Sequence, residues 1–138
     1  MAEYIADTNV YIMAVNDAEF RQRFESFIRD RGPLLVSAIV LGEYLIGIAE
    51  AAKHQAVVTA MRAGTEVVAP IADDWLTAGS AIARLGGGSA TKGRSFWNDA
   101  LLAAQCSRLR ATLITWNEKD FKRLAPHTRV RTVSPFPR

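Results

Sequence analysis

The sequence predicts an α/β fold, a three-layer α/β/α sandwich with a central, mostly parallel four- to five-stranded sheet. Short apolar segments alternate along the chain with longer segments whose apolar residues recur at helical spacing. The 138 residues contain no internal repeat or linker-like stretch, so we expect a single domain over residues 1–138. Hydrophobic residues make up 49% of the chain, which is enough to build a core.

The expected strands are short apolar runs, several of them bounded by turn residues. They cover residues 4–6, 34–36, 66–69, 111–115 and 130–133. Helices are expected between them, over residues 8–15, 18–31, 38–51, 53–63, 74–85, 96–109 and 117–124. The predicted N-caps of four of these helices are Asp17, Ser37, Asp73 and Ser95. A glycine-rich segment, Gly86–Gly93, lacks the Walker spacing and predicts a mobile surface loop rather than a phosphate-binding loop.

Charge is distributed unevenly along the chain. Residues 1–83 carry six basic and eleven acidic residues, whereas residues 84–138 carry eleven and three. Thirteen of the 17 basic residues are arginine, which suits phosphate and carboxylate partners. An anionic partner and ordinary solvated helix faces explain this asymmetry equally well. The single cysteine, Cys106, allows no internal disulfide and favours the reducing cytoplasm, and we expect no signal peptide or membrane helix.

Three acidic residues are each isolated within apolar sequence. Asp7, Glu43 and Asp99 are each the only charged residue in a window of at least 13 residues. A buried carboxylate without a partner is unfavourable by an amount on the order of several kcal/mol. Something outside each element must therefore compensate its charge.

A shared divalent cation would compensate all three acids. Asp7 ends the first expected strand, Glu43 lies in the second turn of a helix, and Asp99 lies in the first turn of another. All three therefore lie near the carboxyl edge of the sheet, where ligands bind in such folds. Acidic oxygens are the ligands that Mg²⁺ and Mn²⁺ prefer.

A purely structural interpretation is the alternative. Asp7 would then cap a helix, Glu43 would pair with a distant arginine, and Asp99 would profit from the helix dipole. The coincidence of three isolated acids favours the metal site. Asn117 and Asp120 follow the fourth strand and lie at the same edge, although a helix cap with solvated charges explains them too.

Four segments in order now match a known family. They are residues 4–9 (Tyr-Ile-Ala-Asp-Thr-Asn), 37–43 (Ser-Ala-Ile-Val-Leu-Gly-Glu), 98–104 (Asn-Asp-Ala-Leu-Leu-Ala-Ala) and 113–121 (Leu-Ile-Thr-Trp-Asn-Glu-Lys-Asp-Phe). With them, the sequence resembles the PIN-domain ribonucleases, and most closely their VapC-like branch, the toxins of type II toxin–antitoxin pairs. The resemblance implies Mg²⁺- or Mn²⁺-dependent hydrolysis of phosphodiester bonds in single-stranded or structured RNA.

The resemblance also implies roles for particular residues. Asp7, Glu43, Asp99 and Asp120 would be the catalytic, metal-binding acids, and Glu43 could ligate the metal or orient the attacking water. The residues expected to hydrogen-bond around them are Thr8, Asn9, Thr115 and Asn117. The glycine-rich loop is longer than the family pattern, so the residues that contact substrate stay open.

Candidates for RNA contact are basic and aromatic side chains in the second half of the chain. They are Lys92, Arg94, Arg108, Arg110, Arg123 and Trp116, with Trp97 expected in the core instead. Solvated surface charge explains each basic residue as well. The resemblance further implies a homodimer and a small VapB-like antitoxin that inserts an arm near the acidic pocket.

Three other interpretations compete with an active nuclease. A haloacid-dehalogenase-like phosphatase would have an aspartate two residues after Asp7, where this chain has Asn9. A receiver-type phosphoacceptor module would have an aspartate at the end of the third strand, where this chain has Ala69-Pro70. A PIN fold that has lost catalysis and only binds RNA or protein remains open.

Overall fold

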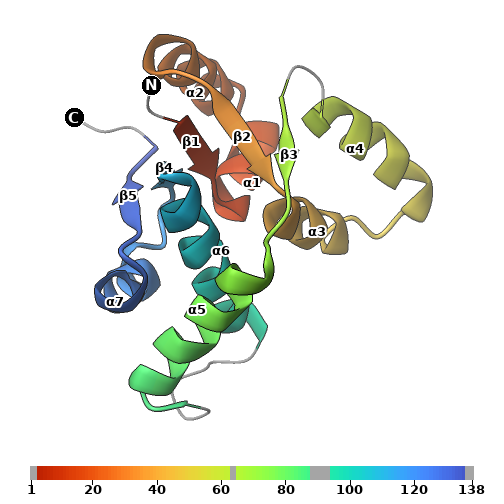
Figure 1. Ribbon diagram of the computed structural model, residues 1–138. Coiled ribbons are helices and arrows are strands. Elements are labelled where there is room, and N and C mark those ends of the chain that lie inside the picture. The colour runs from red at the N-terminus through yellow and green to blue at the C-terminus, as the bar shows by residue number, and fades with distance from the viewer. Residues whose placement is uncertain (1–2, 63–64, 88–93, 136–138) are drawn as a thin grey trace.

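The central sheet of the protein has five strands and only parallel pairings. The computed structural model describes residues 3–62, 65–87 and 94–135. The strand order is β3-β2-β1-β4-β5 (Figure 1). The strands are β1 (Glu3–Ala6), β2 (Leu34–Ser37), β3 (Val67–Val68), β4 (Ala111–Ile114) and β5 (Arg131–Val133). The predicted α/β sandwich with a parallel sheet is confirmed.

Helices connect the strands in the predicted alternation. They are α1 (Thr8–Asn16), α2 (Ala18–Arg31), α3 (Ala38–Ile46), α4 (His54–Arg62), α5 (Ala72–Arg84), α6 (Arg94–Leu109) and α7 (Glu118–Thr128), with a 3₁₀ turn η1 (Ala51–Lys53) before α4. Figure 1 shows α7 beside β5 at one edge of the sheet and α4 beyond β3 at the other. Most of the predicted glycine-rich loop lies outside the described residues.

Two of the four predicted helix caps are confirmed. Asp17 Oδ1 accepts a hydrogen bond from the Phe20 backbone N–H at 3.1 Å. The Ser37 hydroxyl accepts one from the Ile39 N–H at 3.2 Å. Both caps satisfy N–H groups that have no partner inside their helix.

The other two predicted caps are wrong. Helix α5 begins at Ala72, and Asp74 rather than Asp73 accepts a hydrogen bond from the Ile71 N–H, at 2.9 Å. An acid in the first turn can reach back to the residue before the helix, so the pattern alone did not separate adjacent aspartates. Helix α6 already includes Arg94, which places Ser95 inside it.

Two helix ends also differ from the prediction. Helix α3 ends at Ile46, before Gly47, instead of continuing to residue 51. Helix α7 continues to Thr128, four residues beyond the predicted end, although it contains Pro126. Its end coincides with Arg129, whose φ of 63° is left-handed and whose N–H bonds the Ala125 carbonyl.

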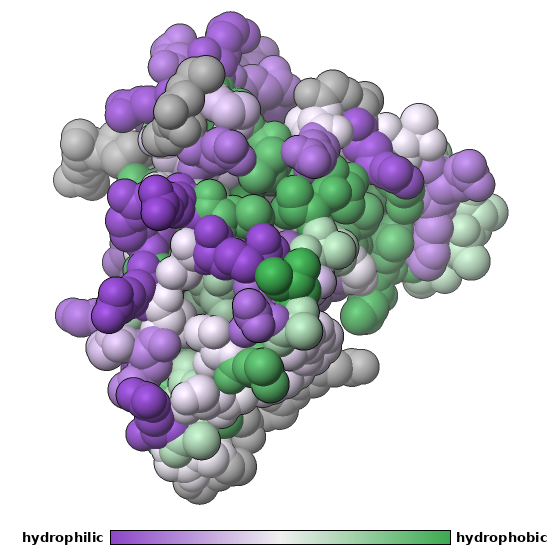
Figure 2. All heavy atoms as spheres, viewed as in Figure 1, coloured by the Kyte–Doolittle hydropathy of each residue, from purple (hydrophilic) through white to green (hydrophobic). Residues whose placement is uncertain are grey.

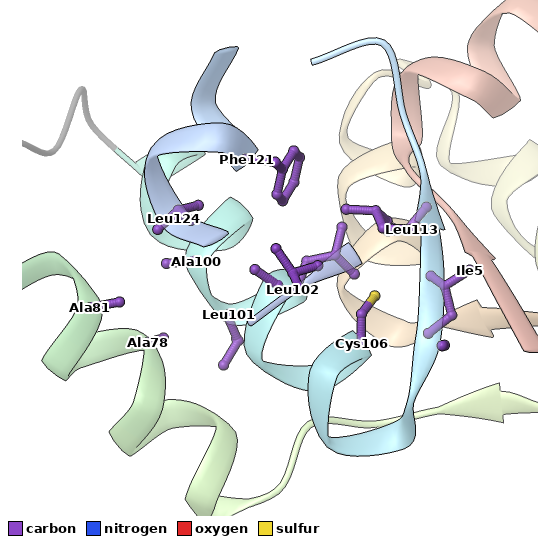
Figure 3. Close-up of a cluster of buried hydrophobic side chains, with 14 of the residues drawn as sticks. Ile5, Ala78, Ala81, Ala100, Leu101, Leu102, Cys106, Leu113, Phe121 and Leu124 are labelled. Atoms are coloured by element: carbon purple, nitrogen blue, oxygen red, sulfur yellow. The ribbon is translucent and has the colours of Figure 1, made fainter. Parts of the chain in front are cut away.

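The alternating side chains of the strands divide the core into two clusters. Ile5 and Leu113 face the larger cluster, built with α5, α6 and α7, where Leu102, Phe121 and other side chains pack (Figure 3). The neighbouring strand residues face a smaller cluster with α1 and α2. They are Tyr4, Ala6, Leu34 and Ile114. This arrangement puts helices on both faces of the sheet.

The register of the two central strands determines what lies at their carboxyl ends. Ala6 of β1 pairs with Ile114 of β4, so the next residues, Asp7 and Thr115, are neighbours. The Asp7 N–H donates to the Ile114 carbonyl at 2.9 Å, which fixes the chain as it leaves the sheet. The sheet therefore brings residues 108 positions apart to one edge.

The molecular surface includes an apolar region. Figure 2 shows hydrophobic residues gathered over β2, β3 and α3. Exposed large hydrophobic side chains include Ile46 on α3 and Trp75 and Leu76 on α5. Within the described ranges, no helix combines the length and apolar composition that crossing a membrane requires.

Candidate metal centre

Asp7 lies between the end of β1 and the start of α1. Its Oδ1 accepts from the Thr8 backbone N–H at 2.8 Å, which makes it the N-cap of α1. Its Oδ2 accepts from the Thr115 hydroxyl at 2.8 Å and from the Asn9 side-chain amide at 3.4 Å. Burial raises the pKa of Asp7, and the bonds from Thr115 and Thr8 oppose that rise.

Asp99 lies in the second turn of α6, because that helix begins at Arg94; the prediction of a first-turn position is wrong. Its side chain is only 7% exposed and accepts a hydrogen bond from the Asn117 side-chain amide at 3.2 Å. Burial, and then the negative charges of Asp7, Glu43 and Asp120, raise the pKa of Asp99 to about 8. This carboxyl group is therefore crowded by like charge.

Glu43 projects from α3, and both of its carboxylate oxygens are held by neutral donors. The Thr8 hydroxyl donates to Oε1 at 3.0 Å. The side-chain amide of Asn98 donates to Oε2 at 3.3 Å. These donors come from α1 and α6, so Glu43 is tied to both neighbouring helices.

Asp120 occupies the first turn of α7. Its Oδ2 accepts from the Asn117 amide at 3.3 Å, so Asn117 bridges Asp99 and Asp120. Arg123 lies 4.0 Å away from its Oδ1, at the limit of an ion pair, and its guanidinium also lies over the Phe96 ring. The partly exposed Arg123 offsets the charge of Asp120 only weakly.

The four acids thus come from four elements and share one edge of the sheet. Among the described side chains, which do not include that of Arg94, no lysine or arginine forms an ion pair with Asp7, Glu43 or Asp99. The acids are close enough to repel one another, yet in the described part of the chain no three acidic, histidine or cysteine side chains converge closely enough to hold an ion as they stand. Hydrogen bonds from hydroxyl and amide groups keep them separate but adjacent.

The donor set nevertheless fits a hard divalent cation. Carboxylate oxygens are the preferred ligands of Mg²⁺ and Mn²⁺, and a cation would relieve the repulsion around Asp99. The buried Oδ1 of Asn9, whose amide reaches Asp7, has no hydrogen-bond partner among the described residues and could accept from a metal-bound water.

Not all of the predicted candidates for RNA contact are available for that role in the structure. Lys92 and the side chain of Arg94 lie outside what the structure describes. Arg108 is not free for phosphate, because its guanidinium forms a bidentate ion pair with buried Asp74 at 2.9 Å. Trp116 is 42% exposed and packs on Phe20, with ring centroids 4.9 Å apart.

Trp97 is partly buried against the larger core cluster, as expected, and its ring lies 5.8 Å from that of Trp75. Sequence reasoning missed the contact of Asn98 with Glu43. Asn98 directly precedes Asp99 and begins the family-like segment 98–104, and this position could have identified Asn98 as a site residue.

The comparisons with known proteins agree with this geometry. The model of the PIN domain family matches residues 4–126. A search of curated proteins finds no match. The chain belongs to the PIN-domain family, a family of nucleases.

Solved structures show the same fold. A chain in the crystal structure of VapBC2 from Rickettsia felis bound to a promoter DNA fragment is 23% identical, with 96% of this chain and 98% of that chain covered and a TM-score of 0.72. A chain of DNA-bound VapBC from Salmonella typhimurium is 22% identical, with 99% of this chain and 100% of that chain covered and a TM-score of 0.74. A chain of VapBC-1 from nontypeable Haemophilus influenzae is 22% identical, with 96% of this chain and 98% of that chain covered and a TM-score of 0.72. At these identities the likeness establishes the fold alone.

Proposed function

We propose that this protein is a metal-dependent endoribonuclease and the toxin of a VapBC-type toxin–antitoxin pair. One observation carries the proposal: four carboxylates from separate elements share one edge of the sheet. Burial, and then repulsion from the other three acids, raises the pKa of Asp99 to about 8. Among the described side chains, Asp7, Glu43 and Asp99 have no ion-pair partner, and such crowding of acids is typical of a site that recruits a metal ion. Membership of the PIN-domain family supports hydrolytic chemistry on nucleic acid.

The proposed cofactor is Mg²⁺ or Mn²⁺, held by Asp7, Asp99, Glu43 and Asp120. When bound, such an ion would neutralise a phosphate and lower the pKa of a bound water. Asp7 and Asp99 are the buried acids of the set and are our proposed direct ligands. Glu43 is half buried and would orient the attacking water and accept its proton.

Neutral side chains would keep these acids in place. Thr115 and Asn9 donate to Asp7, and Asn117 donates to both Asp99 and Asp120. Neutral donors fix the direction of a carboxylate without cancelling its charge, so the charge stays available for a cation. This differs from Asp74, which Arg108 neutralises.

RNA is the proposed substrate. The excess of basic residues in the second half of the chain favours an anionic partner. Trp116 exposes part of its ring next to Thr115 and Asn117, where a base could stack on it. Contacts from Lys92 and Arg94 remain part of the proposal, since their side chains are not described.

A small antitoxin and a second copy of the chain are the proposed protein partners. The similar structures from Rickettsia, Salmonella and Haemophilus are of VapBC assemblies. Ile46 and Trp75 line one cleft, and the nearby apolar surface would suit a homodimer. The cytoplasm, where RNA and such an antitoxin are present, is the proposed compartment.

Cleavage of single-stranded RNA by single-residue variants tests the proposal. Asp7→Asn and Asp99→Asn are expected to lose Mg²⁺-dependent cleavage by at least a hundredfold while staying folded. Asp74→Asn is the matched control, because Asp74 is equally buried but lies outside the acidic site. Full activity in both Asp7→Asn and Asp99→Asn would end the proposal.

A catalytically inactive PIN-fold module that binds RNA or protein is the second candidate. It is favoured by the absence, in the described ranges, of three convergent ligand side chains. Calorimetric titration separates the two, because an inactive module of this kind would bind neither Mg²⁺ nor Mn²⁺ at the acids.

A further inference from the structure

Glu43 depends on other helices for its orientation more than Asp7 and Asp99 do. Asp7 is fixed by its role as the N-cap of α1, and Asp99 is enclosed by burial. Glu43 has a longer side chain, is only half buried, and lies in the middle of α3 with no capping role. A glutamate in such a position retains several rotamers unless tertiary contacts select one.

Two contacts restrict this freedom, and they act on different oxygens. Thr8 donates to Oε1 at 3.0 Å and Asn98 donates to Oε2 at 3.3 Å. A single hydrogen bond would leave the carboxylate free to rotate about it. Two bonds from α1 and α6 determine both the position and the plane of the carboxylate.

The chemistry of Asn98 suits this task. Its amide holds Glu43 without neutralising it, whereas a lysine or arginine at this position would compete with a cation for the carboxylate. Asn98 also directly precedes Asp99, so one turn of α6 supplies an acid to the site and a donor to a second acid. Asn98 and Glu43 line the same cleft, open to solvent beside α5.

We propose that Asn98 is a positioning residue that, together with Thr8, orients the carboxylate of Glu43 for metal binding and catalysis. This inference rests on the proposed nuclease function and deepens it. Removing the amide frees Glu43 while leaving all four acids present. Losses of outer hydrogen-bonding partners at metal sites commonly cost tenfold to a hundredfold in affinity or activity.

A double-mutant cycle between Asn98 and Glu43 tests the proposal with two readouts. Asn98→Ala is expected to lower kcat for RNA cleavage about tenfold with KM within twofold, and to weaken Mn²⁺ binding in calorimetry about threefold to tenfold. In a Glu43→Ala background, the same change is expected to alter Mn²⁺ affinity and residual activity by less than twofold. Ser95→Ala, at an exposed position of the same helix, is the control and should match the wild type.

The proposal is overturned if Asn98→Ala leaves both kcat and Mn²⁺ affinity unchanged, or if its losses are equally large without Glu43. Asn98→Leu, which has a similar size and no hydrogen-bond donor, replaces the alanine variant if that variant melts more than a few degrees lower. The measurement of Mn²⁺ affinity lets a failure of this proposal be distinguished from a failure of the proposed nuclease function. A protein that binds Mn²⁺ but does not cleave RNA would contradict the nuclease, and the cycle on Mn²⁺ affinity would still decide the role of Asn98.

Discussion

Replacing Asp99 by asparagine is expected to stabilise the metal-free protein. The carboxyl group is buried among three other acids, and its pKa of about 8 lies well above the 3.8 of an unperturbed aspartate. At neutral pH, ionisation of Asp99 therefore stabilises the unfolded chain, whereas in the folded protein Asp99 stays mostly protonated. Asparagine removes this penalty and keeps an oxygen that can accept from Asn117.

The size of the effect follows from the pKa difference. One pKa unit corresponds to about 1.4 kcal/mol, so the shift sets an upper limit of roughly 4 kcal/mol at pH 7. Relaxation and water entry reduce such values, and we expect Asp99→Asn to raise the free energy of unfolding by about 2 kcal/mol. For a domain of this size the melting temperature would rise by roughly 5–10 °C.

The pH dependence has a defined sign. Because the folded pKa lies above the unfolded one, the contribution of Asp99 to stability is fully present below about pH 4 and is lost as the pH rises to about 8. The difference between Asp99→Asn and the wild type should therefore be small at pH 4 and largest near pH 8. Excess Mn²⁺ should stabilise the wild type more than the variant.

Denaturant unfolding in EDTA, from pH 4 to pH 8, measures this difference. Asp74→Asn is the control with the opposite expected sign, because it leaves Arg108 without its partner and the Ile71 N–H with a weaker acceptor. We expect it to lose about 2 kcal/mol of stability. If Asp99→Asn were no more stable than the wild type at pH 7 while the control behaved as expected, the account of charge crowding would be refuted.

Three further predictions concern the acids, the cofactor and the core. Thr115→Val removes the hydroxyl that donates to Asp7 and should lower RNA cleavage about tenfold, whereas Thr115→Ser should retain most of it; comparable rates in both would exclude this role. Removal of divalent ions with EDTA should abolish cleavage, and added Mn²⁺ should restore it; activity that persists in EDTA would contradict metal dependence. Phe121→Ala empties a fully buried position and should cost about 3–5 kcal/mol in urea unfolding, so a loss below 1 kcal/mol would contradict the packing described for α7.

The sequence predicted those parts of the fold and of the site that depend on local pattern. Short apolar runs identified all five strands, and several of these runs are bounded by residues that favour turns or caps. The proximity of Asp7 to Thr115 was also predictable, since the carboxyl ends of parallel strands meet at one edge of a sheet. The roles of the predicted acids remain proposals that the experiments above test.

The remaining features depend on how distant helices pack, which no local pattern encodes. The pairing of Asp74 with Arg108 requires α5 and α6 to lie side by side in one particular register. The contact between Asn98 and Glu43 likewise depends on the rotation of α6 against α3. Local pattern likewise left Arg108 as a candidate for phosphate contact or for solvated surface charge, whereas the fold turns it toward buried Asp74.

Anomalous diffraction from crystals soaked in Mn²⁺ tests the central claim most directly. The account predicts a manganese peak about 2.0–2.3 Å from carboxylate oxygens of both Asp7 and Asp99. A peak bound elsewhere, or no peak at these acids at millimolar Mn²⁺ and neutral pH, would contradict it.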